Sequence, residues 1–261
     1  MTLGADLTML AVNPQRGAVR LPVQLGFALA GSELVDLAVR GRLEATADGL
    51  LRVADPELVG DPVLDAALIN LAEFCEAGRG ADEWVNDSGP ERVDVYVAAL
   101  VESGELRART RRLGGQAAQT QHSRLRPADK DRRGVLGAEL LAAAADDADL
   151  YQQAFGALAH AADIPTDVLR RYPEAAAVLA QRARRFLNTR LPEPPGPAPD
   201  DSAPDDDGDG PAAEPEPKQL SAEDARRLAI GLAVAAAVEI ATNLTSSSRL
   251  TTTRRLSLRW G

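Results

Sequence analysis

Residues 25–53 read LGFALAGSELVDLAVRGRLEATADGLLRV, and this stretch decides the fold class. Its apolar residues recur at helical spacing: Leu25, Leu29, Leu34, Leu37 and Ala38. This spacing predicts a helix with one buried face, and Gly41 is a typical residue to end it. Two short segments, 43–46 and 50–53, then flank Ala47-Asp48-Gly49, which is the pattern of a β-hairpin. The stretch therefore predicts a long core helix followed by a small hairpin.

The same order of elements recurs farther along the chain. A second helix with an apolar face precedes Ser103-Gly104-Glu105-Leu106, as the first precedes Arg40-Gly41-Arg42-Leu43, and a strand over 106–110 follows. Further helices are expected over 62–76, 137–145, 150–162 and 173–187. We therefore predict a mainly α protein, with a single helical domain over residues 1–190 that carries short β-hairpins.

The charge of the chain is concentrated in one segment. The 261 residues include 29 basic and 39 acidic side chains, a net charge of −10. Residues 192–217 hold nine of the acids, nine of the 17 prolines and no base, so the remainder has 29 bases and 30 acids, or −1. Such a composition predicts a disordered Pro/Asp-rich insertion, a tether over 191–219 before the last helix. Net charge therefore does not exclude an anionic partner for the folded part.

A last apolar helix is expected after the tether. Residues 228–241 are almost wholly apolar, but a run of this length interrupted by Glu239 is too short to cross a bilayer. We favour a helix over 220–244 that docks on the domain, with an interfacial membrane helix as the alternative. Residues 245–261 carry arginines and no acid, which predicts a basic tail.

The sequence offers little catalytic chemistry. It contains no phosphate-binding loop, nucleophile elbow or zinc-protease motif, and His122 and His160 lie in unlike surroundings without an obvious nucleophile. Residues 205–216 match the spacing of a calcium loop, but they lie among prolines. We therefore expect a protein that is not an enzyme and has no cofactor and no metal site. A lone Cys75 and an N-terminus without a secretory signal predict a cytoplasmic protein.

The strongest basic feature is the segment 107–133. It contains nine basic residues and two acids, a local charge of +7. Such a segment can bind phosphate groups, attract the acidic tether, or remain a solvated loop.

Five short motifs occur in an order that resembles the Golgi phosphoprotein 3 family, which includes many bacterial proteins. They are the 33–43 helix and turn, the segment 59–68, Trp84, the segment 100–106 and the segment 158–163. The resemblance covers most of residues 3–187 and extends to the apolar helix 228–241, with the tether as an insertion. It implies a mainly α-helical, non-enzymatic peripheral membrane protein that binds phosphatidylinositol 4-phosphate.

The residues that bind the head group in eukaryotic members of that family are not retained. The resemblance places them at Leu21, Ala30, Pro90 and Val93, none of which carries the expected Trp or cation. The nearest cations, Arg20 and Arg92, are each one residue away from an expected position. The family's apolar membrane hairpin also corresponds here to a polar run, 114–121.

We therefore expect a peripheral protein on the inner face of the membrane that contacts anionic phospholipid or phosphoinositide head groups. The candidate lipid-binding residues are Arg20, Arg92, Arg107, Arg109, Arg111 and Arg112. A protein-interaction scaffold that has lost lipid binding is the first alternative, and a protein partner or a homo-oligomer would fit it.

A winged-helix-like nucleic-acid binder is the second alternative, because a helix followed by a hairpin occurs twice. No nucleic acid is expected, since the candidate recognition helices carry Glu33, Asp36, Asp94 and Glu102 where phosphate contacts need cations.

Overall fold

The structure is a computed structural model that describes residues 2–109, 124–129, 131–188 and 220–257; for Arg109 and residues 245–257 it describes the backbone alone. Its helices in chain order are α1 (Leu3–Ala11), α2 (Pro22–Val39), α3 (Pro62–Glu76), α4 (Ala81–Glu102), α5 (Arg132–Ala142), α6 (Leu150–Ala161), α7 (Pro165–Val168), α8 (Pro173–Phe186) and α9 (Ala222–Ser257). The strands are β1 (Leu43–Ala45), β2 (Leu51–Val53), β3 (Leu106–Arg109) and β4 (Arg124–Pro127). The predicted mainly α fold with short hairpins is confirmed, whereas the tether itself lies outside the described residues.

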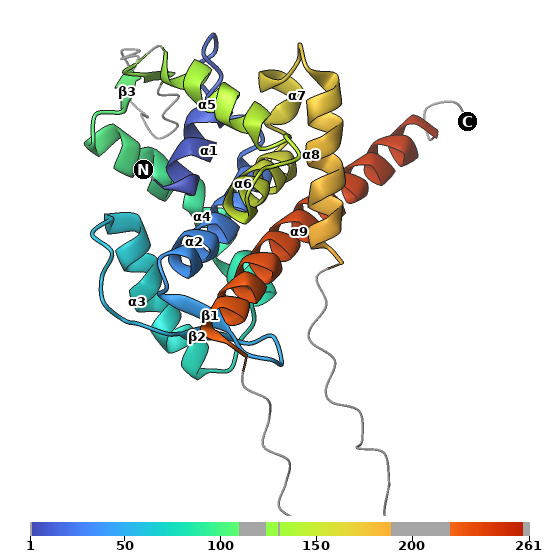
Figure 1. The fold of residues 1–261 in the computed structure, drawn as a ribbon. Helices are drawn as coiled ribbons and strands as arrows, with labels where there is room; N and C mark the ends of the chain where they lie inside the picture. The colour runs from blue at the N-terminus through green and yellow to red at the C-terminus, as the bar shows by residue number, and fades with distance from the viewer. Residues whose placement is uncertain (1, 110–123, 130, 189–219, 258–261) are drawn as a thin grey trace, which may run out of the picture.

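Helix α2 forms the centre of the molecule. Every residue from Leu25 to Ala38 is buried, and the helix packs against α1, α4, α6 and α9 (Figure 1). Among the described residues, α2 and the segment Ala222–Leu244 of α9 are long and apolar enough to cross a membrane. Because 78% of α2 is buried inside the protein, its hydropathy is that of a core helix.

Small residues bring the neighbouring helices close to α2. A Cβ added to Gly26 would lie 2.2 Å from the carbonyl oxygen of Gly89 on α4, and a Cβ on Gly31 would lie 3.0 Å from the Cβ of Ala237 on α9. The contact at Gly26 requires glycine because a Cβ there would collide with the backbone of α4, whereas a Cβ on Gly31 would need a small displacement of α9. These close contacts explain how α4 and α9 enclose the apolar length of α2.

Local sequence signals set the first hairpin and the helix that follows it. Leu43 pairs with Val53 and Ala45 pairs with Leu51 in an antiparallel ladder, at the predicted place. Helix α3 begins where expected because Asp61 accepts hydrogen bonds from the amides of Val63 and Leu64 and Pro62 occupies the first turn.

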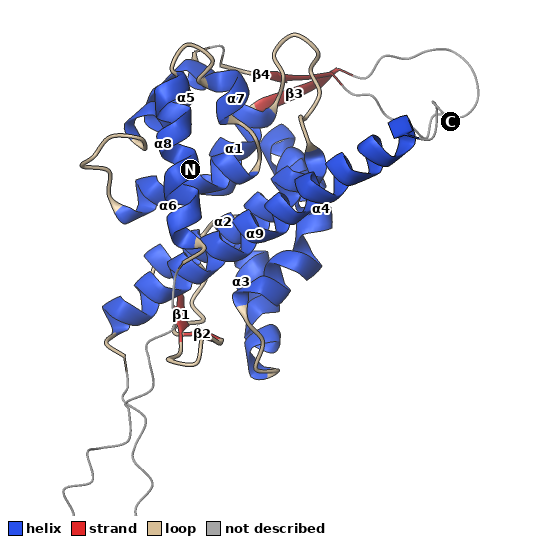
Figure 2. Ribbon diagram, turned by 90° about the vertical axis from the view of Figure 1, so that its right-hand side faces the viewer, coloured by secondary structure: helices blue, strands red, loops and turns tan. Residues whose placement is uncertain are grey.

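Three helices differ from the expectation. Helix α5 begins at Arg132 rather than Gly137, and the short α7 follows a turn that we did not predict. The backbone of α9 remains helical to Ser257, where a basic tail was expected. Figures 1 and 2 place the two hairpins at opposite ends of the molecule, with α9 running beside α2 between them.

Candidate anion-binding surface

The hairpin β3–β4 presents arginines on its outer face. The antiparallel register places Arg107 opposite Arg126 and Arg109 opposite Arg124. Because side chains alternate across a strand, Leu106 and Leu125 point the other way and are buried in the core. Arg107, Arg124 and Arg126 are exposed. We call these four arginine positions, 107, 109, 124 and 126, the arginine face.

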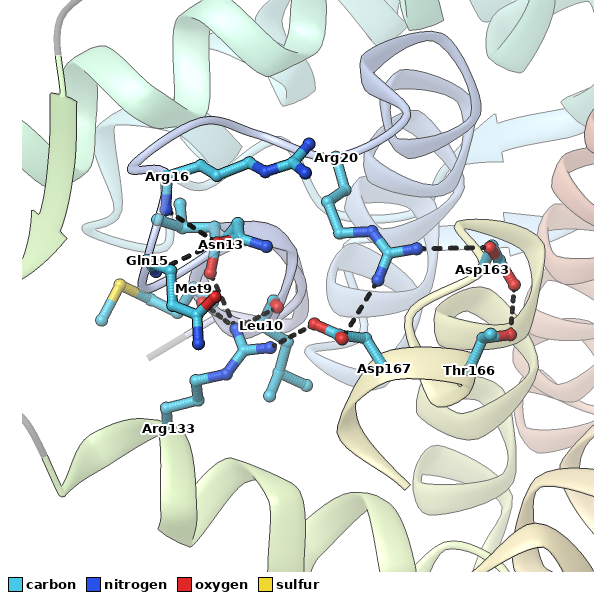
Figure 3. Close-up of polar contacts among 11 residues, drawn as sticks. Met9, Leu10, Asn13, Gln15, Arg16, Arg20, Arg133, Asp163, Thr166 and Asp167 are labelled. Carbon is cyan, nitrogen blue, oxygen red and sulfur yellow. Dashed lines mark hydrogen bonds and ion pairs between the residues drawn. The ribbon is translucent and has the colours of Figure 1, made fainter. Parts of the chain in front are cut away.

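The loop between α1 and α2 lies directly against this hairpin. The amide of Leu125 donates a 2.8 Å hydrogen bond to the carbonyl of Gly17, and a Cβ on Gly17 would approach the carbonyl oxygen of Leu125 to 2.9 Å. Gly17 also has φ +67°, which glycine adopts without strain. Asn13 closes the turn by accepting hydrogen bonds from the amides of Gln15 and Arg16 (Figure 3). The exposed Arg16 therefore extends the positive surface beyond the hairpin.

Arg20 lies at the other end of that loop, in an ion-pair cluster (Figure 3). Its guanidinium lies 3.3 Å from Asp167 and 3.8 Å from Asp163, and its side chain is 36% exposed. Asp167 also pairs with Arg133 at 3.3 Å. Ion pairs this exposed contribute little to stability, so Arg20 can exchange its carboxylates for another anion at low cost.

Arg133 has a structural role in the same cluster. Its Nη1 donates to the carbonyls of Leu10 and Val12, at the C-terminal end of α1. Those carbonyls have no partner within the helix, and a cation there also complements the helix dipole. Arg133 therefore fixes α5 to α1 beneath the α1–α2 loop.

Comparison with known proteins identifies the family. The family model for Golgi phosphoprotein 3 (GPP34) matches residues 3–205. The chain belongs to the Golgi phosphoprotein 3 family. The resemblance drawn from the five sequence motifs is thus confirmed. A search of the curated proteins finds no match to the chain. The family match ends before α9, although α9 packs directly on the central helix.

The structure separates the candidate residues of this Golgi phosphoprotein 3 family member. Arg107 lies on the arginine face, and Arg109 stands in its register on β3. Arg20 lies in the neighbouring ion-pair cluster. Arg111 and Arg112 lie outside the described residues.

Arg92 lies apart from the other candidates, between α4 and α2. Its Nε is 3.1 Å from the carboxylate of Glu33, its guanidinium lies 5.5 Å from the ring centre of Trp84, and its side chain is only 14% exposed. Glu33 is completely buried, and this burial raises its pKa to about 8 in spite of Arg92. Arg92 is therefore held by an internal partner.

The four positions aligned with the family's head-group residues do not form a charged pocket in this chain. Ala30 on α2 and Val93 on α4 are buried, whereas Pro90 and Leu21 are exposed. Leu21 has a left-handed backbone with φ +40° at the start of α2. The exposed arginines described above belong instead to the hairpin β3–β4 and to the α1–α2 loop.

Three members of this surface are absent from the candidate lipid-binding residues: Arg124 and Arg126, which belong to the predicted basic segment 107–133, and Arg16, which lies outside it. Arg124 and Arg126 flank the buried Leu125, and this alternation is the signal of a half-buried strand that could have found them. Their pairing with β3 joins segments separated by residues 110–123, which local patterns do not reveal. For Arg16, the sequence indicated only that it lies in a turn, and nothing in it indicated that Arg16 is close to the hairpin.

The described part of the chain holds no cluster of three or more metal-ligating side chains. Burial raises the pKa of the Cys75 thiol to about 11, and burial lowers the pKa of His160. An un-ionised thiol is a poor nucleophile, so Cys75 is a packing residue at neutral pH.

Proposed function

We propose that this member of the Golgi phosphoprotein 3 family is a non-enzymatic peripheral membrane protein that binds anionic phospholipid surfaces. Its arginine face is the contact, and its location is the cytoplasmic side of the membrane. The observation that carries the proposal is the direct opposition of Arg107 to Arg126 and of Arg109 to Arg124. Like charges directly opposite each other in a ladder destabilise the hairpin, and an anionic partner offsets that repulsion.

Among the described residues, no acidic side chain forms an ion pair that neutralises the charge of the arginine face. Acids pair with Arg20, Arg92, Arg132 and Arg133, but none pairs with Arg16, Arg107, Arg124 or Arg126 within those parts of the chain. Each cation near an anionic leaflet contributes on the order of 1 kcal/mol. The arginine face and Arg16 together are therefore sufficient for binding that depends on salt and on surface charge.

The arginine face is better suited to recognise the charge density of a membrane than to recognise one particular lipid head group. The exposed arginines of the arginine face lie on a two-stranded ribbon. Arg92, which lies close in sequence to the aligned positions Pro90 and Val93, is paired with the buried Glu33. A stereospecific phosphate site needs several buried donors converging on one point. We accordingly propose that phosphatidylinositol 4-phosphate binds in proportion to its charge.

Vesicle co-sedimentation of the full-length chain tests this function. We expect binding to vesicles that contain phosphatidylglycerol at low salt, weaker binding at high salt, and little binding to phosphatidylcholine alone. Vesicles with phosphatidylinositol 4-phosphate, matched in total charge, should bind equally well. The absence of binding to anionic vesicles at low salt would overturn the proposal and favour the scaffold alternative. Tighter binding to duplex DNA at the same salt would overturn it in favour of a nucleic-acid ligand.

A further inference from the structure

An exposed apolar corner lies at the start of α2, at the end of the loop whose Gly17 is hydrogen-bonded to β4. It consists of Leu21, Pro22 and Val23; Leu21 is 39% exposed and Val23 is 53% exposed. Single exposed apolar residues are ordinary on protein surfaces. Three in succession at the start of a helix form a continuous exposed apolar segment.

The backbone of this corner is strained. Leu21 has φ +40° and ψ +60°, a left-handed conformation that glycine or asparagine adopts more readily than leucine. It also occupies the N-cap position of α2, where its side chain makes no capping hydrogen bond. A leucine here stabilises neither the turn nor the helix, so its side chain is better explained by a contact outside the folded chain.

The surroundings of the corner identify that contact. Arg20 precedes it directly, and Gly17 of the same loop is hydrogen-bonded to Leu125 of β4. Figures 1 and 2 show the α1–α2 loop and β3–β4 at the same end of the molecule. An apolar segment that follows Arg20 and ends the loop that carries the exposed Arg16 complements the boundary between anionic head groups and acyl chains, where cations meet phosphates and apolar side chains enter the hydrocarbon.

We infer that the corner of Leu21, Pro22 and Val23 inserts into the bilayer and anchors the protein after the arginine face has adsorbed to it. This inference rests on the proposed function. It adds an apolar component to binding that electrostatic adsorption alone does not have, and this component resists salt.

The double variant Leu21→Gly/Val23→Ser tests the anchor in the full-length chain. Glycine relieves the strained backbone and serine is favourable in the first turn of a helix, so the variant should unfold at the same or a higher temperature. Its affinity for phosphatidylglycerol vesicles should fall about tenfold, as expected for losing two partly inserted apolar side chains. Because its cations are intact, its affinity should fall with salt as steeply as that of the unmodified protein, so that the loss is the same factor at low and at high salt.

The variant Ile69→Ser is the matched control. Ile69 is 63% exposed on α3, which lies at the end of the molecule opposite β3–β4. This variant should bind vesicles as the unmodified protein does. Equal vesicle affinity for the double variant and the unmodified protein would overturn the anchor while leaving electrostatic binding in place. If the unmodified protein fails to bind anionic vesicles, both the anchor and the proposed function are overturned.

Discussion

Arg107 of β3 stands directly opposite Arg126 of β4, and no carboxylate pairs with either side chain among the residues that the structure describes. The two leucines of the same strands, Leu106 and Leu125, face the core. The hairpin therefore has one face that stabilises the fold and one face whose charges repel each other.

Neutralising one member of this pair should stabilise the free protein. We expect Arg107→Gln to raise the free energy of unfolding by up to about 0.5 kcal/mol, because the repulsion across the ladder is removed. Chemical denaturation at low salt measures this change, and high salt should diminish it. A loss of stability greater than about 1 kcal/mol would mean that Arg107 has an attractive partner in the fold.

The contact between α2 and α4 depends on glycine. Gly26→Ala should lower the free energy of unfolding by about 2 kcal/mol or more, because the new Cβ would meet the backbone of Gly89. Gly134→Ala on α5 is the matched control, since a Cβ there meets nothing within 4 Å. The control should be neutral or stabilising by up to about 1 kcal/mol. Equal effects of the two substitutions would contradict the close approach of the helices.

Glu33 should make stability depend on pH in a definite direction. Burial raises its pKa from 4.5 to about 8, although Arg92 opposes the shift, and Trp84, Asp36 and Tyr96 surround it. A carboxyl whose pKa is higher in the folded state stabilises the protein fully below its unfolded pKa. That stability is lost as the pH rises through the folded pKa. Its contribution should therefore decline between about pH 4.5 and pH 8.

Comparison with Glu33→Gln isolates this contribution. The variant carries no titrating proton at this position, so the stability of the unmodified protein relative to the variant should fall as the pH rises from 5 to 8. Denaturant unfolding at several pH values measures the difference. A relative stability that grows with pH would mean that Glu33 is ionised in the native state and that its pairing with Arg92 prevails over burial.

Arg133 should be needed for the packing of α5 on α1. Arg133→Met keeps the apolar stem but removes the donors to the carbonyls of Leu10 and Val12, and we expect a loss of about 2 kcal/mol in the free energy of unfolding. Arg126→Met is the control, because the exposed Arg126 makes no such contact in the described structure. Its stability should change by less than about 0.5 kcal/mol, as is usual for surface positions. Similar losses in the two variants would contradict the structural role of Arg133.

Local sequence signals predicted the elements whose causes are local. Asp61 and Pro62 mark the start of α3, and the turn at Asp48-Gly49 marks the first hairpin. The apolar spacing from Leu25 to Ala38 indicated a buried helix. The five ordered motifs also identified the family.

Long-range pairing explains what the sequence did not predict. Arg92 is an ordinary surface cation by helical spacing, and only the packing of α4 on α2 brings it to Glu33. Likewise, the pairing of β4 with β3 makes neighbours of arginines that are distant in the chain. The candidate site could therefore be located approximately, as a basic segment, but its members depend on the tertiary fold.

The central claim is that the arginine face binds anionic membranes, and a charge-matched pair of variants tests it most directly. Arg107→Gln/Arg126→Gln removes two cations from the face, whereas Arg184→Gln/Arg185→Gln removes two exposed cations from α8. In co-sedimentation with phosphatidylglycerol vesicles at low salt, the first variant should lose about 2 kcal/mol of binding free energy, roughly 30-fold in affinity, and the second should lose much less. Equal losses in the two variants would contradict the claim, because binding would then follow net charge and not this surface.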